Sequence, residues 1–213
     1  GESGKLKGSL NVQDGAKLTV ENGEYVSAYI RTGSEGVFKQ GKCTSELYLG
    51  EASSLESEDG AVCEITDGYY QYVNACAGTK LAISGINTKI SSLYVRSNSL
   101  VSRGYEGKRA RVELSGGSYN KIGIQTRRRD ELLDETNGYA IADMLSPGYD
   151  FFYVGMKKTV YRAELYAENV EVLPSDTKED LGRAEVELVC NGTDSSYYEN
   201  WQSVLEYLYS NRT

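Results

Sequence analysis

The side chains that most often perform catalysis are scarce in this 213-residue chain, because it contains no histidine. Without an imidazole there is no Ser-His-Asp triad, no Cys-His dyad and no histidine-ligated metal site. Acid-base or nucleophilic chemistry would therefore rest on carboxylates, thiols, lysines or arginines.

Paired carboxylates are the nearest approach to a catalytic pattern. Glu56, Glu58 and Asp59 lie close together, and a glycosidase needs two carboxyl groups across a sugar. In an acidic chain such pairs arise by chance, and no acidic cluster recurs in phase with the repeat described below to hold calcium. We therefore expect no catalytic residue, no metal site and no cofactor.

The one strong basic cluster consists of Arg127, Arg128 and Arg129. Guanidinium groups bind carboxylates and sulfates in pairs of hydrogen bonds, so this run could clamp a uronate, a sulfate or a sialic acid. The competing interpretation is a solvated loop, because carboxylates follow directly: Asp130, Glu131, Asp134 and Glu135. The arginines are weak ligand-binding candidates.

Tyrosine supplies nearly all the aromatic surface, with 18 residues against three Phe and one Trp. A flat ring with a hydroxyl suits a recognition surface. The tyrosines that stand next to inward-pointing residues or in loops are expected to face outward and are weak ligand-binding candidates: Tyr48, Tyr69, Tyr72, Tyr94 and Tyr105. The alternative is that they form stacked ladders that stabilise neighbouring strands.

The four cysteines show no CxxC spacing, which argues against a zinc site. Cys43, Cys63 and Cys76 are close enough in sequence for a disulfide in an extracellular chain, whereas buried reduced thiols are equally compatible with the pattern. The state of Cys190 is also open.

Charge and hydropathy exclude two partner classes. The net charge is −8 and the pI about 4.8, so binding to nucleic acid, which needs clustered positive charge, is not expected. No run approaches the roughly 20 apolar residues of a membrane span. The chain has neither an initiator methionine nor a signal peptide, and we expect it to be a piece of a longer protein.

An internal repeat is the most informative feature. The pattern apolar-x-apolar-x-x-Gly-x-Tyr occurs three times and ends at Tyr25, Tyr70 and Tyr119, which are 45 and 49 residues apart. Each copy opens with an alternating triplet and is preceded by another, and these triplets are Leu10–Val12, Leu18–Val20, Leu47–Leu49, Cys63–Ile65, Leu93–Val95 and Val112–Leu114. Alternation predicts strands, and the three tyrosines, being in register, are expected to be structural.

Short strands, regular turns and a long repeat predict a β-solenoid, in which each coil buries its apolar face against its neighbours. Two coils per repeat would give about 22 to 25 residues per coil. The alternative is an antiparallel β-sandwich, because Asp14-Gly15 between two alternating runs is also a hairpin signal. A tight antiparallel hairpin from Leu10–Val12 to Leu18–Val20 would contradict the solenoid.

The remainder of the chain is less regular. A helical turn or two is expected around 139–145, ended by Pro147-Gly148, with strands over 151–154 and 160–173. Residues 174–183 are predicted to be a linker, and 184–190 a further strand. Trp201, Val204, Leu205 and Leu208 then recur at the spacing of an amphipathic helix.

Two stretches resemble known proteins. The run from Gly8 to Gly23 is similar to coils of bacterial surface β-helix proteins, and Gly116-Gly117-Ser118-Tyr119 with Ala142–Leu145 and Gly148–Phe151 resembles an element of secreted repeat proteins of Gram-positive, often gut-dwelling, bacteria. The likeness covers about residues 5–155 and is interrupted by the insertion 127–137. It implies a right-handed parallel β-helix with short helical caps: a module over 1–173, a linker over 174–183 and a capping strand and helix over 184–213.

The resemblance implies an adhesin-like module, secreted or displayed on the cell surface, that binds a host or environmental glycan or protein without catalysis and adjoins neighbouring modules of the same chain. Candidate loops are 31–42, 102–109 and 125–138, since loops on a rigid scaffold often carry function. The alternatives are a carbohydrate-active β-helix enzyme, either a polysaccharide lyase or a hydrolase, and a purely structural stalk module.

Overall fold

The structure, a computed structural model, describes most of the first 125 residues and several later strands. The described residues are 4–54, 57–96, 110–125, 144–152, 155–159, 164–175 and 185–186. Their regular structure is almost wholly β-strand, as predicted. Within these ranges no helix is long and apolar enough to span a membrane.

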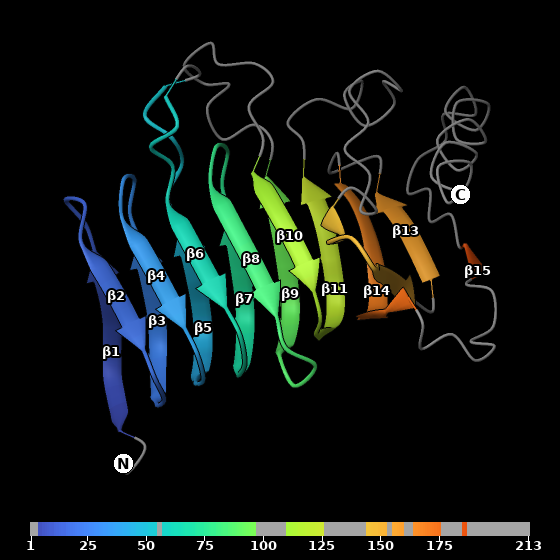
Figure 1. The fold of residues 1–213 in the computed structure, drawn as a ribbon, viewed down its shortest axis with the longest axis horizontal. Helices are drawn as coiled ribbons and strands as arrows, with labels where there is room; N and C mark the ends of the chain where they lie inside the picture. Colours follow the sequence, from blue (N-terminus) through green and yellow to red (C-terminus); the bar gives the residue numbers. More distant parts are fainter. Residues whose placement is uncertain are drawn as a thin grey trace.

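Two sheets lie one in front of the other, and the chain alternates between them (Figure 1). The ten-stranded sheet, called the long sheet, begins with β1 (Lys5–Val12), β3 (Glu24–Ile30), β5 (Lys42–Leu49), β7 (Tyr69–Ala75), β9 (Lys89–Arg96) and β11 (Ser118–Gln125). The five-stranded sheet, called the short sheet, contains β2 (Lys17–Val20), β4 (Glu35–Phe38), β6 (Val62–Ile65), β8 (Lys80–Ser84) and β10 (Arg111–Ser115).

Pairing is parallel throughout the short sheet and from β1 to β11 of the long sheet. Leu10–Val12 lie in β1 and Leu18–Val20 in β2, so these segments belong to different sheets and form no hairpin with each other. The antiparallel sandwich is therefore wrong for this part of the chain. All six alternating triplets predicted to be strands lie in strands of the structure.

The strand direction changes after β11. β14 (Glu164–Pro174) pairs antiparallel with β11, β12 (Tyr149–Phe152) and β13 (Gly155–Thr159), and β15 (Glu185–Val186) pairs in parallel with β13. β13 was not predicted, because Gly155-Met-Lys-Lys-Thr159 shows no alternation of apolar and polar residues.

Strand register explains the repeat. Tyr25 pairs with Cys43, Cys43 with Tyr70, Tyr70 with Ile90, and Ile90 with Tyr119. These positions are separated by 18, 27, 20 and 29 residues, so the three repeat copies lie on alternate strands of the long sheet. The mean of these spacings agrees with the predicted 22 to 25 residues per coil, but the individual spacings are unequal.

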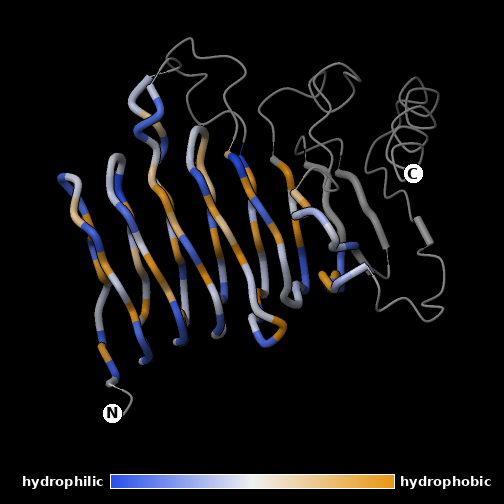
Figure 2. Tube along the Cα trace, viewed as in Figure 1, coloured by the Kyte–Doolittle hydropathy of each residue, from blue (hydrophilic) through white to orange (hydrophobic). Residues whose placement is uncertain are grey.

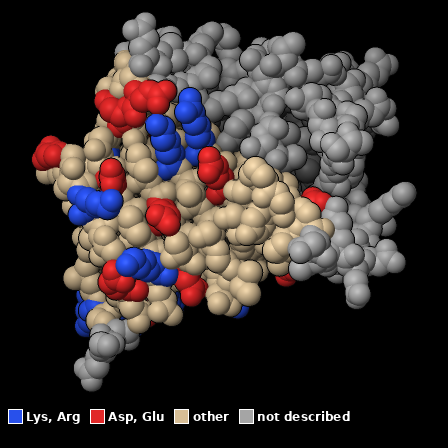
Figure 3. Space-filling model, in the orientation of Figure 1, with Lys and Arg blue, Asp and Glu red and all other residues tan. Residues whose placement is uncertain are grey.

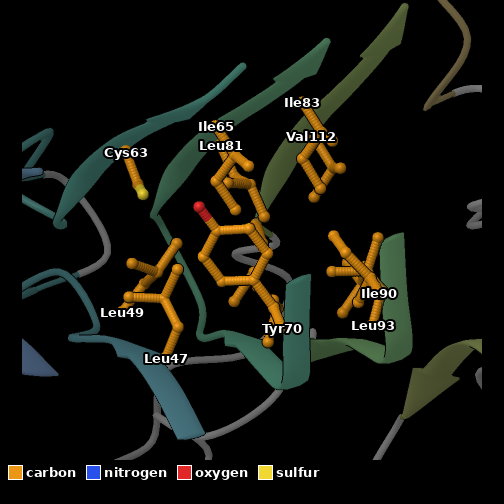
Figure 4. Close-up of a cluster of buried hydrophobic side chains, with 14 of the residues drawn as sticks. Leu47, Leu49, Cys63, Ile65, Tyr70, Leu81, Ile83, Ile90, Leu93 and Val112 are labelled. Carbon is orange, nitrogen blue, oxygen red and sulfur yellow. The ribbon is translucent and has the colours of Figure 1, made fainter. Parts of the chain in front are cut away.

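The repeat tyrosines form part of the core. Tyr25, Tyr70 and Tyr119 are 3%, 0% and 1% exposed, which confirms their structural role. The hydroxyl of Tyr70 donates to the carbonyl of Asp67 (3.0 Å), and that of Tyr119 donates to Gly116 (2.8 Å). Figure 4 shows the Tyr70 ring surrounded by apolar side chains from both sheets. Cys43 and Ile90 hold the same register position on the intervening strands.

The remaining core residues also lie in columns across the strands, and Figure 2 shows the resulting alternation of apolar and polar positions. The long sheet contributes two buried columns, composed of Ala28, Leu47, Val73, Leu93, Ile122 and of Ile30, Leu49, Ala75, Val95, Ile124. The short sheet packs against them with Phe38, Ile65, Ile83 and Leu114. Equivalent positions on successive strands stack, so strands that are too short to be stable alone together bury a continuous core.

One corner, where the short sheet leads into the long sheet, is built from glycines. Gly23, Gly41 and Gly68 have φ angles of 140°, 156° and 110°. The amide following each glycine bonds to the preceding strand's corner, as when Lys42 N donates to Gly23 O (2.8 Å) and Tyr69 N to Gly41 O (2.8 Å). A Cβ on Gly68 would lie 2.4 Å from Gly41 O, so the corner admits no side chain there.

The opposite edge, where the long sheet leads into the short sheet, varies in length. β7 and β8 are joined by the short connection 76–79, whereas 50–61 joins β5 to β6 and 97–110 joins β9 to β10. The predicted loop 31–42 is wrong, since it contains β4 (Glu35–Phe38). The strand was missed because glycine occupies its inward position: a Cβ on Gly36 would lie 2.9 Å from side-chain atoms of Ile30 and Phe38.

Cys43, Cys63 and Cys76 are free and buried, so the thiol interpretation holds for these three residues. Gln125, the first residue of the predicted loop 125–138, ends β11, and Pro174, the first residue of the predicted linker 174–183, ends β14. Several predictions lie outside the described residues: Cys190, the loop 102–109, the rest of the loop 125–138, most of the helical turn at 139–145, the linker after Ser175, and the C-terminal helix. Of the predicted strand 184–190, β15 is described.

Candidate functional site

A row of aromatic side chains crosses the outer face of the long sheet. The position between its two buried columns points outward, and on four successive strands it holds Tyr29, Tyr48, Asn74 and Tyr94. We call these four residues the tyrosine row. All three rings are half-buried, and Tyr72, on the neighbouring outward position of β7, is 41% exposed.

The rings of the row are held by contacts with each other and with cations. The centroids of Tyr29 and Tyr48 are 6.3 Å apart with an interplanar angle of 48°, an ordinary geometry for aromatic pairs. The guanidinium of Arg31 lies 5.1 Å from the Tyr29 centroid, and the Lys121 ammonium 5.3 Å from that of Tyr94. Both distances suit cation–π attraction, which fixes the ring planes while part of each ring stays accessible.

Asn74 is the polar centre of the row. It is 5% exposed, and its Nδ2 donates to Oε1 of Glu46 on β5 (2.6 Å). Its carbonyl oxygen is buried without a hydrogen-bond partner. An unsatisfied buried carbonyl costs about 1–3 kcal/mol, and the charge-assisted bond to Glu46 offsets part of that cost.

Tyr48 covers a thiol. Burial raises the pKa of the Tyr48 hydroxyl, and its hydrogen bond with Cys76 raises it further. Cys76 is 1% exposed, and burial also raises the pKa of its thiol against the lowering effects of Tyr48 and Arg96. A thiol kept protonated is a poor nucleophile.

The predicted site residues are divided by the structure. Tyr48, Tyr72 and Tyr94 lie together on the outer face of the long sheet, while Tyr69 lies apart in a groove of about 480 Å³ along the glycine corner. The others lie outside the described residues: Tyr105, Arg127, Arg128 and Arg129.

Sequence reasoning missed three members of the site, Tyr29, Asn74 and Glu46. A signal for Tyr29 existed, because Ala28-Tyr29-Ile30 has the same alternation as Leu47-Tyr48-Leu49. Nothing local distinguishes Asn74 or Glu46, whose hydrogen bond joins positions 28 residues apart.

The outer face of the short sheet differs in kind. Lys17 pairs with Glu35 (2.9 Å) and Lys80 with Glu58 (3.0 Å), and Lys39 pairs with Glu21 (3.0 Å) just beyond the ends of β4 and β2. Figure 3 shows acidic and basic side chains interspersed over this face. Such exposed pairs are typical of a solvated surface and contribute little stability.

The candidate carboxylates have structural partners. Glu58 pairs with Lys80 and Arg111, and the pKa of Asp59 falls to about 2, because Ser53 and Ser57 donate hydrogen bonds to its carboxylate. Glu56 lies outside the described residues. No group of three or more metal-ligating side chains occurs in the described ranges.

Comparison of the chain with protein-family models, with curated proteins and with solved structures found no match.

Proposed function

We propose that the chain is a right-handed parallel β-helix module of a secreted or surface-displayed bacterial protein, and that it binds a host or environmental ligand without catalysis. The parallel pairing of both sheets and the alternation of the chain between them support the β-helix. The resemblance of Gly8–Gly23 to coils of bacterial surface proteins supports the origin and location.

The observation that carries the binding role is the contrast between the two outer faces. The strands of the short sheet carry paired charges and no tyrosine, whereas the long sheet carries Tyr29, Tyr48, Tyr72 and Tyr94 on adjacent strands. Partly exposed tyrosines gathered on a rigid sheet form a recognition surface for a glycan or a protein.

In this proposal the rings provide flat contact area and hydroxyl groups, and they lose little entropy on binding. Arg31 and Lys121 already hold Tyr29 and Tyr94 through cation–π contacts, and the parallel strands that carry the rings lie about 4.8 Å apart. A preorganised surface loses less free energy on binding than a flexible one.

Binding of the purified chain to an array of host and environmental glycans and extracellular proteins tests the proposal. The variants Tyr94→Ala and Tyr72→Ala remove rings from the face, and Ile86→Ala, at a residue 69% exposed in a turn, is the matched control. We expect a saturable ligand whose affinity falls at least tenfold in each tyrosine variant and is unchanged in Ile86→Ala.

A ligand whose binding is unaffected by both tyrosine variants would contradict the assignment of this face. Absence of any ligand would favour a structural stalk, in which the same rings only stabilise neighbouring strands. Calcium-dependent release of unsaturated sugar from a polysaccharide would favour the lyase alternative.

A further inference from the structure

A groove of about 480 Å³ runs along the glycine corner and is separate from the tyrosine row. Gly23, Gly41 and Gly68 belong to its lining, so main chain forms part of its floor. It extends across successive strands of the long sheet, so it is shaped for an extended ligand lying across the strands and not for a compact one.

The outward position beside this floor forms one register column: Lys5, Glu24, Lys42, Tyr69 and Lys89. Lysine therefore recurs on every second strand, at intervals of about 10 Å, which is two strand spacings. Glu24 bridges two of the lysines, with Nζ–carboxylate distances of 2.9 Å to Lys5 and 3.9 Å to Lys42.

The column carries a net positive charge although the net charge of the whole chain is −8. The lining contains three ammonium groups and one carboxylate. Asp67, the residue before Gly68, accepts a hydrogen bond at Oδ1 from the Gly68 amide (2.6 Å). The groove is thus a site of local positive charge and attracts an anion despite the acidic surroundings.

Neutral hydrogen-bonding groups complete the lining, with the side chains of Asn22, Gln40 and Asn87. Tyr69 presents a half-buried ring between two lysines, and its hydroxyl is held by Gln71 (2.6 Å) and Ser91 (2.9 Å). Amides pair with sugar hydroxyls, and a fixed ring accepts the apolar face of a pyranose, so the lining favours a glycan over an acidic peptide.

We propose that this corner groove binds a linear acidic polysaccharide whose uronate sugars alternate with neutral sugars. Each disaccharide presents one carboxylate, at an interval comparable to the spacing of Lys5, Lys42 and Lys89, while the neutral sugar faces the intervening strand. The glycine floor lets the chain approach the main chain closely.

Calorimetric titration of the purified chain with hyaluronan octasaccharide, which has this alternating composition, tests the proposal. Lys42→Ala/Lys89→Ala should weaken binding at least tenfold, and Glu24→Gln should tighten it two- to fivefold by removing the opposing carboxylate. The matched control is Lys17→Ala/Lys80→Ala, in β2 and β8 of the short sheet, which changes net charge equally and should leave the affinity unchanged.

Three outcomes would overturn the proposal: no binding of the octasaccharide, equal loss in both double variants, and equal affinity for its carboxyl-reduced form. Binding of a poly-glutamate peptide as tight as that of the octasaccharide would overturn the choice of a glycan. Tyr94→Ala should leave hyaluronan binding intact, so failure of the tyrosine-face proposal and failure of the groove can be told apart.

Discussion

Asn74 donates a 2.6 Å hydrogen bond from its side-chain amide to Oε1 of Glu46, and its own carbonyl oxygen is buried without a partner. The bond joins β7 to β5 beneath the aromatic face. It fixes a polar residue between Tyr48 and Tyr94, where alternation alone would admit any outward side chain.

Asn74→Asp should destabilise the fold at neutral pH by more than the 1.5–3 kcal/mol typical of a bond to a charged group, because a carboxylate would then face Glu46. One of the two carboxyls would have a raised pKa in the folded state. The loss of unfolding free energy in the variant should therefore become smaller as the pH falls below about 5. Urea denaturation at pH 7 and pH 4 checks this, with Asn87→Asp in an exposed turn as control. Equal deficits at both pH values would contradict it.

Tyr48→Ala should expose Cys76 to alkylation, because the Tyr48 side chain covers this thiol. In a Cys190→Ser background the native protein should react slowly with iodoacetamide, since Cys43, Cys63 and Cys76 are buried and burial raises the pKa of Cys43 to about 11. Mass spectrometry of the modified peptides should locate the fast reaction at Cys76 alone. Tyr72→Ala is the control, and fast alkylation there as well would argue against specific cover by Tyr48.

Gly68→Ala should be far more disruptive than Gly33→Ala. Both glycines have positive φ, 110° and 75°, but a Cβ on Gly68 would lie 2.4 Å from Gly41 O, whereas nothing lies within 4 Å of one on Gly33. Gly33→Ala should cost about 1–2 kcal/mol from left-handed strain, and Gly68→Ala clearly more because the corner must also shift. Chemical denaturation of the two variants gives the comparison, and equal costs would show that the corner is not closely packed.

Tyr70→Ala should lower stability by about 3–5 kcal/mol, because the ring is fully buried between strands. Tyr70→Phe keeps the ring and loses only the bond to Asp67 O, so its cost should be about 1 kcal/mol. Thermal unfolding followed by circular dichroism measures both. A similar loss in Tyr72→Ala, at an exposed ring, would contradict the distinction between buried and outward tyrosines.

Asp59→Asn should lower the melting temperature at pH 5–7 but not at about pH 2. Hydrogen bonds from Ser53 and Ser57 depress the folded pKa of Asp59 from 3.8 to about 2. A depressed carboxyl pKa stabilises the fold above the unfolded value, and the effect is lost as the pH falls through about 2. Melting temperatures across this range check the sign, with Glu113→Gln as control; a constant difference at all pH values would contradict it.

The parallel sheets could be predicted because their signals are local. Each Gly-x-Tyr copy contains its own turn glycine, its alternating triplet and its buried ring, so Tyr25, Tyr70 and Tyr119 were assigned correctly. The intervening strands were harder, because Cys43 and Ile90 occupy the same buried position without matching the pattern. A search on tyrosine therefore found every second strand.

The candidate binding surface could be predicted only in part. Tyr48, Tyr72 and Tyr94 face outward as expected, because alternation fixes the side of the sheet. Which outward residues meet depends on register across strands 18 to 29 residues apart, and the unequal connections hide that register. For the same reason the groove column of Lys5, Lys42 and Lys89 has no signature in the sequence.

The two long connections, 50–61 and 97–110, leave the same edge, where the long sheet leads into the short sheet, while the glycine corner keeps its close contacts from one strand to the next. The addition of strands and the insertion of loops therefore involve different edges: segments can be inserted at one edge without disturbing the stacking that propagates from the other. The exposed turn Asp14-Gly15 at this edge is a natural place to graft a foreign peptide, and the sheets would serve as a display scaffold of fixed pitch.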